Sequence, residues 1–291
     1  FLEPLSAPDE EWNADEAQPA AGAPGVEVRL DEVSVVAGGQ TILSDVDLHL
    51  APGSRVAVVG PSGAGKSSLV GLLLGWNRAA AGDLLVDGEP LDEAHLARLR
   101  RHTAWVDPSV SVWNRSLAEN LTYGTGRPAV DPTSVEEADL APVVARLPRG
   151  LDEELGEGGG LLSGGEAQRV RLARALLRPD VRLAVLDEPF RGLDRAQRRK
   201  LLDRARAWWP GATLLFVTHD VGDTLTFDRV LVVDDGRIVE DGDPRVLAEQ
   251  EGSRYAVLLR AETDAASAFA DGHWRRLRLE DGRAQVAELA P

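Results

Sequence analysis

Residues 55–69, with the sequence RVAVVGPSGAGKSSL, decide the fold. Arg55–Val59 is a short apolar run that leads into a glycine, which predicts a buried strand. Ser67–Leu74 has apolar residues at close helical spacing and predicts a helix. Between them, Gly60–Ser67 matches the pattern G-x-x-x-x-G-K-[ST] of phosphate-binding loops. A strand, this loop and a helix in that order predict a nucleotide-binding α/β domain.

The residue types of this loop suit phosphate chemistry. Glycines let backbone N–H groups curl around phosphate oxygens, and the start of the following helix adds partial positive charge. In this pattern Lys66 reaches the β- and γ-phosphates, and the Ser67 hydroxyl is a ligand of Mg²⁺. Lys66 is one of only two lysines in the chain, which counts against an ordinary glycine-rich turn. The residues expected at the nucleotide are Gly60, Pro61, Ser62, Gly63, Ala64, Gly65, Lys66, Ser67 and Ser68.

Two acidic residues end a second apolar strand, predicted at Leu183–Leu186. This strand would hold the Asp187 carboxylate where it binds Mg²⁺, usually through water. Glu188 would then lie near the γ-phosphate, where a general base orients and deprotonates the attacking water. Many strands end in acids, so this motif points to catalysis only together with the phosphate-binding loop.

The remaining pattern predicts a mostly parallel sheet with helices on its faces, because strands and helices alternate along the chain. Val26–Val36 and Thr41–Leu50 are expected to pair as an antiparallel β subdomain around a Gly38-Gly39 turn. Residues from about 108 to 178 predict an inserted helical subdomain. Further elements are expected as helices at Glu166–Leu177 and Arg195–Trp208, a strand at Thr213–Val217, and a C-terminal hairpin in which Trp274–Leu279 and Ala284–Leu289 flank Glu280-Asp281-Gly282.

Composition narrows the classes of function. The formal net charge is -16, and a general affinity for nucleic acid needs a basic face, so no nucleic-acid partner is expected. The chain has no cysteine and therefore no disulfide or thiolate metal site. No run approaches the roughly 18–20 apolar residues that span a bilayer. The chain begins with Phe1 and has no methionine, which suggests a piece of a longer polypeptide.

A third motif, Leu162-Ser163-Gly164-Gly165-Glu166, opens the helix predicted at Glu166–Leu177. A serine and two glycines at a helix start form a place for an anion, although a capped helix without a ligand has the same pattern. With the phosphate-binding loop and the two acids, this motif makes residues 26–260 resemble the ATP-binding cassette (ABC) family. The resemblance implies a P-loop NTPase core that binds ATP and Mg²⁺ and hydrolyses ATP.

The resemblance also assigns roles to residues outside the phosphate-binding loop. In this family the signature, here Ser163, Gly164, Gly165 and Glu166, binds the γ-phosphate of ATP held by a second nucleotide-binding domain, which implies a head-to-tail dimer. His219 matches the family's switch histidine and is expected to act in catalysis with Glu188. Asp194 matches an aspartate that contacts the partner, although Arg191-Gly192 replaces the usual Ser-Ala before Leu-Asp.

Three segments resemble exporters within the family: Leu155–Gly158, Ala118–Leu121 and Gly252–Leu259. They imply a motor domain at the cytoplasmic face of the cell membrane, with a transmembrane domain upstream in the same polypeptide or in a separate chain. Residues 1–25, rich in Pro, Ala, Asp and Glu, would then be a linker after a transmembrane domain. Residues 26–260 would be the nucleotide-binding domain, and 261–291 a C-terminal extension. The second nucleotide-binding domain can be identical or different.

Two positions depart from the family's pattern. Ala37 stands where exporters have an aromatic residue that stacks on adenine, so weaker binding of the base is expected. Pro108 stands where a glutamine contacts Mg²⁺, and the neighbouring Asp107 could replace it as a ligand after a one-residue shift. These departures keep two alternatives open: a non-hydrolysing regulatory half of a heterodimer, and a soluble cassette ATPase.

Overall fold

The strand expected at Arg55–Val59 is β3, which lies inside a six-stranded sheet of order β10-β9-β3-β8-β7-β6. The computed structural model describes residues 24–109, 111–270, 276–280 and 283–287. Neighbouring strands from β9 to β6 run parallel, and the edge strand β10 is antiparallel to β9. The other strands of the sheet are β6 (Thr103–Val106), β7 (Leu183–Asp187), β8 (Thr213–Val217), β9 (Arg229–Asp234) and β10 (Arg237–Gly242).

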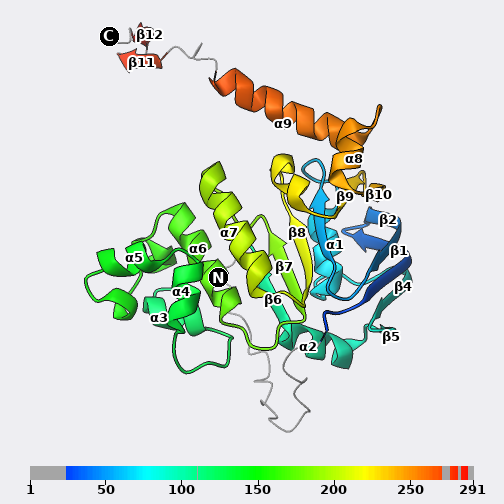
Figure 1. The fold of residues 1–291 in the computed structure, drawn as a ribbon, viewed down its shortest axis with the longest axis horizontal. Helices are drawn as coiled ribbons and strands as arrows, with labels where there is room; N and C mark the ends of the chain where they lie inside the picture. Colours follow the sequence, from blue (N-terminus) through cyan, green and yellow to red (C-terminus); the bar gives the residue numbers. More distant parts are fainter. Residues whose placement is uncertain (1–23, 110, 271–275, 281–282, 288–291) are drawn as a thin grey trace.

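Helices cover both faces of this sheet, which is why its inner strands are apolar throughout. Every residue of β7 and β8 is buried. Helix α1 (Lys66–Leu73) packs on one face, while α6 (Gly164–Leu176) and α7 (Arg195–Trp208) pack on the other (Figure 1). The predicted mostly parallel sheet with helices on both faces is therefore confirmed, with small shifts at the element ends.

The antiparallel β subdomain is present as a four-stranded sheet of order β2-β1-β4-β5. β1 (Val28–Ala37) and β2 (Gln40–Leu50) form the expected hairpin, and the φ angles of its turn glycines are 57° and 78°. Such left-handed backbone favours glycine. β4 (Ala81–Val86) and β5 (Glu89–Pro90) extend the sheet. The sequence does not indicate β4, because it begins with alanine, glycine and aspartate.

The segment from 108 to 178 is mainly helical, as its pattern predicts. Before α6 it contains α3 (Leu117–Thr122), α4 (Pro132–Glu137), α5 (Ala141–Arg146) and the 3-10 turns η1 (Gly150–Asp152) and η2 (Glu157–Gly159). The helix α2 (Glu93–Arg101) lies earlier, before β6. In Figure 1 the helices α3–α6 and the four-stranded sheet lie at opposite sides of the molecule.

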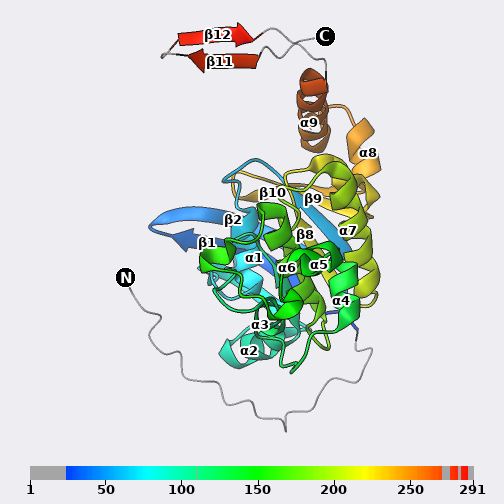
Figure 2. The same cartoon turned by 90° about the vertical axis from the view of Figure 1, so that its left-hand side faces the viewer.

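After β10 come α8 (Pro244–Glu249) and the long helix α9 (Arg254–Ala270), which extends away from both sheets (Figures 1 and 2). The predicted C-terminal hairpin is present as β11 (Arg276–Glu280) and β12 (Arg283–Ala287). The outer residues of its predicted strands, 274–275 and 288–289, and its turn residues, 281–282, lie outside the described residues. Residues 1–23 of the expected linker lie outside them too. In the described parts of the chain, no helix is long and apolar enough to cross a membrane.

Candidate functional site

The three neighbouring parallel strands β3, β8 and β7 end at the same side of the six-stranded sheet, where the carboxyl ends of its parallel strands meet. This side is named the sheet edge. Val217 of β8 pairs with Val58 of β3 on one side and with Asp187 of β7 on the other. The residues that follow these strands continue the pairing: the N–H of Thr218 donates to Val58 O at 3.1 Å, and the N–H of Glu188 donates to Val217 O at 2.9 Å. The strand order therefore places the phosphate-binding loop, the two acids and the His219 segment at the same edge.

Two glycines of the phosphate-binding loop have no room for a side chain. Gly60 has a φ of 151°, and a Cβ there would lie 2.0 Å from Val233 O. Gly65 has a φ of 108°, and a Cβ there would lie 2.7 Å from Leu43 Cδ2. Within the described part of the chain, the N–H groups of Ser62, Gly63 and Gly65 donate to no protein acceptor. They are therefore available as donors to phosphate oxygens.

Lys66 holds its charge inside this loop. Its side chain is buried, and Nζ donates to the carbonyl oxygens of Gly60 and Pro61, both at 2.8 Å. Burial lowers the pKa of Lys66, while the nearby carboxylates of Glu188 and Asp187 oppose that shift. A phosphate group entering the loop would offer the ammonium a charged partner in place of two neutral carbonyls.

Asp187 is a buried carboxylate at the end of β7. Burial raises its pKa to about 6, with the charges of Asp107 and Glu188 adding to the shift and Lys66 opposing it. Hard cations such as Mg²⁺ bind oxygen ligands, and a carboxylate near other negative charges favours a cation. Asp187 and Ser67, which is the second residue of α1, therefore fit Mg²⁺ as ligands. Asp107 contributes to the same electrostatic field, whereas Pro108 has no side-chain donor. Ligation by Asp107 stays a prediction.

The Asp187 carboxylate is expected to destabilise the metal-free fold at neutral pH. Its folded-state pKa of about 6 lies above the ordinary aspartate value of 3.8, so the folded chain loses stability as the pH rises between these two values. Replacement by asparagine removes that loss. With a chelator present, Asp187→Asn should raise the free energy of unfolding by about 2 kcal/mol near pH 7.5, and by much less near pH 4. Urea unfolding over this pH range measures the gain, and an equal gain at both ends would contradict the prediction.

Glu188 is held in a strained conformation. Its φ of 44° lies in the left-handed region, which costs a non-glycine residue roughly 1–3 kcal/mol and is common at functional sites. Its N–H is bound to Val217, and its carbonyl accepts from Nε2 of the buried Gln168 at 3.1 Å. Its carboxylate oxygen Oε1 lies in direct polar contact with Nε2 of His219. Gln168 follows the signature in α6, and nothing in the sequence pattern shows that its side chain orients Glu188.

The side chains of Glu188 and His219 border a cavity of about 500 Å³. Ser62 of the phosphate-binding loop and Thr218 contribute to its wall, as does the loop from Pro189 to Gly192. A volume of this size lies within the range of roughly 300–1,000 Å³ seen for small-molecule sites. The predicted catalytic pair therefore faces a space beside the loop that would hold the phosphates.

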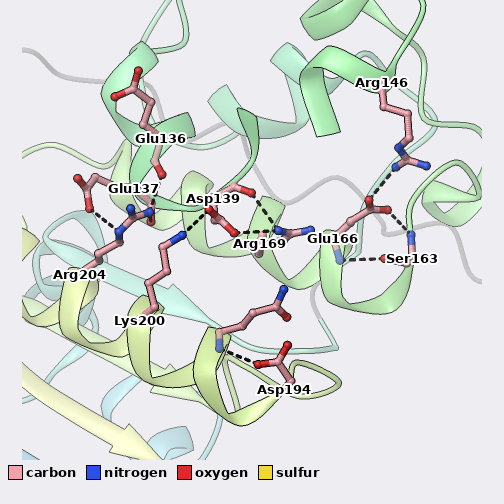
Figure 3. A network of polar contacts seen from close by, with 11 residues as sticks. Glu136, Glu137, Asp139, Arg146, Ser163, Glu166, Arg169, Asp194, Lys200 and Arg204 are labelled. Carbon is pink, nitrogen blue, oxygen red and sulfur yellow. Dashed lines mark hydrogen bonds and ion pairs between the residues drawn. The ribbon is translucent and has the colours of Figure 1, made fainter. Parts of the chain in front are cut away.

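The signature residues lie at the N-terminus of α6, apart from this edge. Ser163 caps the helix and forms a capping box with Glu166, which also binds Arg146 at 2.8 Å (Figure 3). Ser163 and Gly164 are exposed, and a Cβ on Gly164 would meet no atom within 4 Å. At Gly165 a Cβ would lie 2.7 Å from Leu193 Cδ2, so the signature packs against the loop before α7. Its serine and first glycine are open to a second molecule.

Asp194 lies in that neighbouring loop and caps α7, accepting from the N–H of Gln197 at 2.9 Å. Further along, Asp139 forms ion pairs with both helices: with Arg169 of α6 at 3.2 Å and with Lys200 of α7 at 2.8 Å (Figure 3). The signature thus lies at the start of α6 and Asp194 at the start of α7, and Asp139 connects these two helices by ion pairs. The predicted site residues therefore form two groups: one at the sheet edge and one at these helix starts.

Ala37 ends β1 and is exposed at the tip of the β1–β2 hairpin. The hairpin, residues 28–50, contains no Phe, Tyr or Trp. Several aromatic rings of the described residues pack elsewhere, as in the pairs Trp76–Trp105 and Trp113–Tyr123. The hairpin therefore supplies no ring for stacking on a base, as expected from the sequence.

Comparisons with known proteins find relatives of this chain in one family. A family model described as "ABC transporter" matches residues 43–191. An "ATP-dependent lipid A-core flippase" of Xanthomonas oryzae pv. oryzae (strain MAFF 311018) is 41% identical over 214 residues, which are 72% of this chain and 36% of the flippase. A protein of the same name from Hahella chejuensis (strain KCTC 2396) is 38% identical over 79% of this chain and 40% of its own length. The solved structure of a bacterial Atm1-family ABC exporter with ATP bound matches with a TM-score of 0.77 and 31% identity, over 86% of this chain and 44% of that one. The chain spans less than half the length of each of these proteins.

Proposed function

Because this chain belongs to the ABC transporter family, we propose that it is the ATP-hydrolysing motor domain of an exporter and that it works as a head-to-tail pair. The observation that carries the proposal is the division of the predicted ligands of ATP into two groups. The phosphate-binding loop, Asp187, Glu188 and His219 lie at the sheet edge, whereas Ser163 and Gly164 are exposed at the start of another helix. Two copies facing each other would each complete the other's site.

In the proposed mechanism, free N–H groups of the loop and the Lys66 ammonium bind the phosphates of ATP. Mg²⁺ held by Asp187 and Ser67 would neutralise charge on the β- and γ-phosphates. The Glu188 carboxylate takes a proton from the attacking water, and the His219 imidazole, already in contact with Glu188, stabilises charge that develops on the γ-phosphate. Ser163 of a second copy donates its hydroxyl from the opposite side and excludes water.

Export is supported by the names of the relatives and by the exporter-like segments of the sequence. Glu157 in one of these segments is exposed and so could contact another domain. The proposal places the chain at the cytoplasmic face of the cell membrane, with residues 1–25 as a linker, 26–260 as the motor and 261–291 as an extension. The transmembrane domain would lie upstream or in a separate chain.

If two identical chains form each site, the specific activity must depend on protein concentration. We expect MgATP turnover per chain to rise at least about tenfold as the protein is concentrated from below to above the dimer dissociation constant, because lone chains lack the signature half of the site. Steady-state phosphate release over a thousandfold dilution series measures this. Hydrolysis that is already maximal per chain at the lowest concentration, with a monomer shown by light scattering, would contradict pairing.

A further inference from the structure

The segment that follows His219 is bound to helix α7 at both of its ends: Arg206 donates to the side chain and the carbonyl of Thr226 at its end, at 3.1 and 3.0 Å, and Arg198 binds its start. This segment is the 3-10 turn η3 (Val221–Thr226), and Arg198 of α7 forms ion pairs with Asp220 and Asp223 at its start, both at 3.1 Å. Arg198 also lines the cavity beside Glu188. The position of His219 therefore depends on how η3 is held.

The C-terminal helix α9 holds η3 from another direction. Its first turn is fixed on β10, because the Glu240 carboxylate accepts from the backbone N–H groups of Arg254 and Tyr255 at 2.6 and 2.8 Å and from the Ser253 hydroxyl at 3.0 Å. Tyr255 is fully buried, and its hydroxyl bonds to Oγ1 of Thr224 in η3 at 2.9 Å. The helix is thus anchored at its start to both β10 and η3.

Glu262 lies seven residues after Tyr255 and so on the same face of α9. Its Oε2 accepts from the N–H of Gly222 at 2.9 Å, three residues after His219. Burial raises the pKa of the Glu262 carboxyl, the hydrogen bond from Gly222 opposes that shift, and the charges of Asp220 and Asp223 add to it. Glu262 thus interacts with the backbone of η3 at Gly222 and Val221 although two acidic side chains lie nearby, so these backbone interactions and not charge pairing set its position.

We propose that Glu262 is a positioning residue for catalysis: it holds the backbone at Gly222 and thereby fixes the His219 imidazole against Glu188. This inference rests on the proposed function as an ATPase. Reacting groups must be held to within a fraction of an ångström, and small displacements cost up to about a hundredfold in rate. Removing an acceptor from a turn three residues away should loosen His219 without touching the phosphate-binding loop. The C-terminal helix would thus act on the chemical step through the hydrogen bond from Gly222 to Glu262, while the bond between Tyr255 and Thr224 fixes its start on η3.

The test compares Glu262→Ala and Glu262→Leu, which remove the acceptor, with Glu262→Gln, which keeps an oxygen at that position. Asp264→Ala, at an exposed carboxylate of the same helix, is the matched control. Thermal unfolding first shows that each variant is folded, and amide hydrogen exchange at Gly222 reports the bond directly. Steady-state hydrolysis then gives kcat and KM, and a fluorescent ATP analogue gives the Kd.

We expect both acceptor-free variants to exchange the Gly222 amide at least about tenfold faster and to lose about tenfold in kcat, with KM and Kd within twofold of wild type. Glu262→Gln should recover most of the rate, and Asp264→Ala should match wild type. Wild-type kcat in folded Glu262→Ala and Glu262→Leu would overturn the inference while the proposed function stands. A loss that glutamine does not rescue would also overturn it. A wild type that binds ATP without hydrolysing it would overturn the proposed function and the inference together.

Discussion

Glu188→Gln leaves ATP binding intact and slows hydrolysis at least about a hundredfold, because glutamine has the same shape but cannot accept the proton of the attacking water. The backbone at this position is held from both sides by Val217 and Gln168, so the substitution should not move the chain. The contact of this side chain with Nε2 of His219 also loses its carboxylate oxygen as the acceptor, which adds to the loss of rate. Phosphate release under saturating MgATP and titration of a fluorescent ATP analogue measure the two quantities separately.

Glu249→Gln is the matched control for this variant, because Glu249 ends α8 and is exposed, away from the sheet edge. It removes one carboxylate from the chain and should leave turnover within about twofold of wild type, as expected for an exposed position. If Glu188→Gln turned over ATP at a rate close to that of wild type, Glu188 would not be the general base. A weakened ATP affinity would instead indicate a role in binding.

The second large effect is expected at the signature. Ser163→Arg, made in the Glu188→Gln background, should abolish the dimer that MgATP otherwise stabilises, since Ser163 is exposed and would face the nucleotide of the other copy. Arginine cannot cap α6, which costs about 1 kcal/mol, and its long side chain would fill the space meant for the γ-phosphate. In the otherwise wild-type chain the same change should lower hydrolysis at least about a hundredfold. Sedimentation velocity with and without MgATP measures the dimer.

Ser116→Arg separates loss of the cap from loss of the interface. Ser116 forms the same kind of capping box with Glu119 at the start of α3, so its replacement has a similar cost to the helix. We expect this control to dimerise normally. A dimer that survives Ser163→Arg would contradict the head-to-tail arrangement. If Glu188→Gln is already monomeric at saturating MgATP, a different second chain becomes the leading explanation.

The sequence by itself determined the local chemistry of this protein. Gly60–Ser67 is recognisable because its glycines, lysine and serine act on one ligand within eight consecutive residues, so their spacing carries the whole geometry. Asp187 and Glu188 could be found for a similar reason, since an apolar strand followed by acids places both side chains at a strand end. The absence of a ring at Ala37 could likewise be noted from its place in the β1–β2 hairpin.

The tertiary structure alone decided how these pieces meet. The family resemblance led us to expect that His219 acts with Glu188, but no local pattern states that β8 lies between β3 and β7, which is what places the two side chains beside each other. The same holds for Gln168, which binds the Glu188 carbonyl from 20 residues away, and for Glu262, which reaches Gly222 across 40 residues. The elements that carry these polar residues are brought together by apolar contacts at other positions along the same elements. The polar residues themselves therefore follow no periodicity or spacing that the sequence would reveal. A local pattern records what neighbouring residues do together, and only packing decides which distant residues share a site.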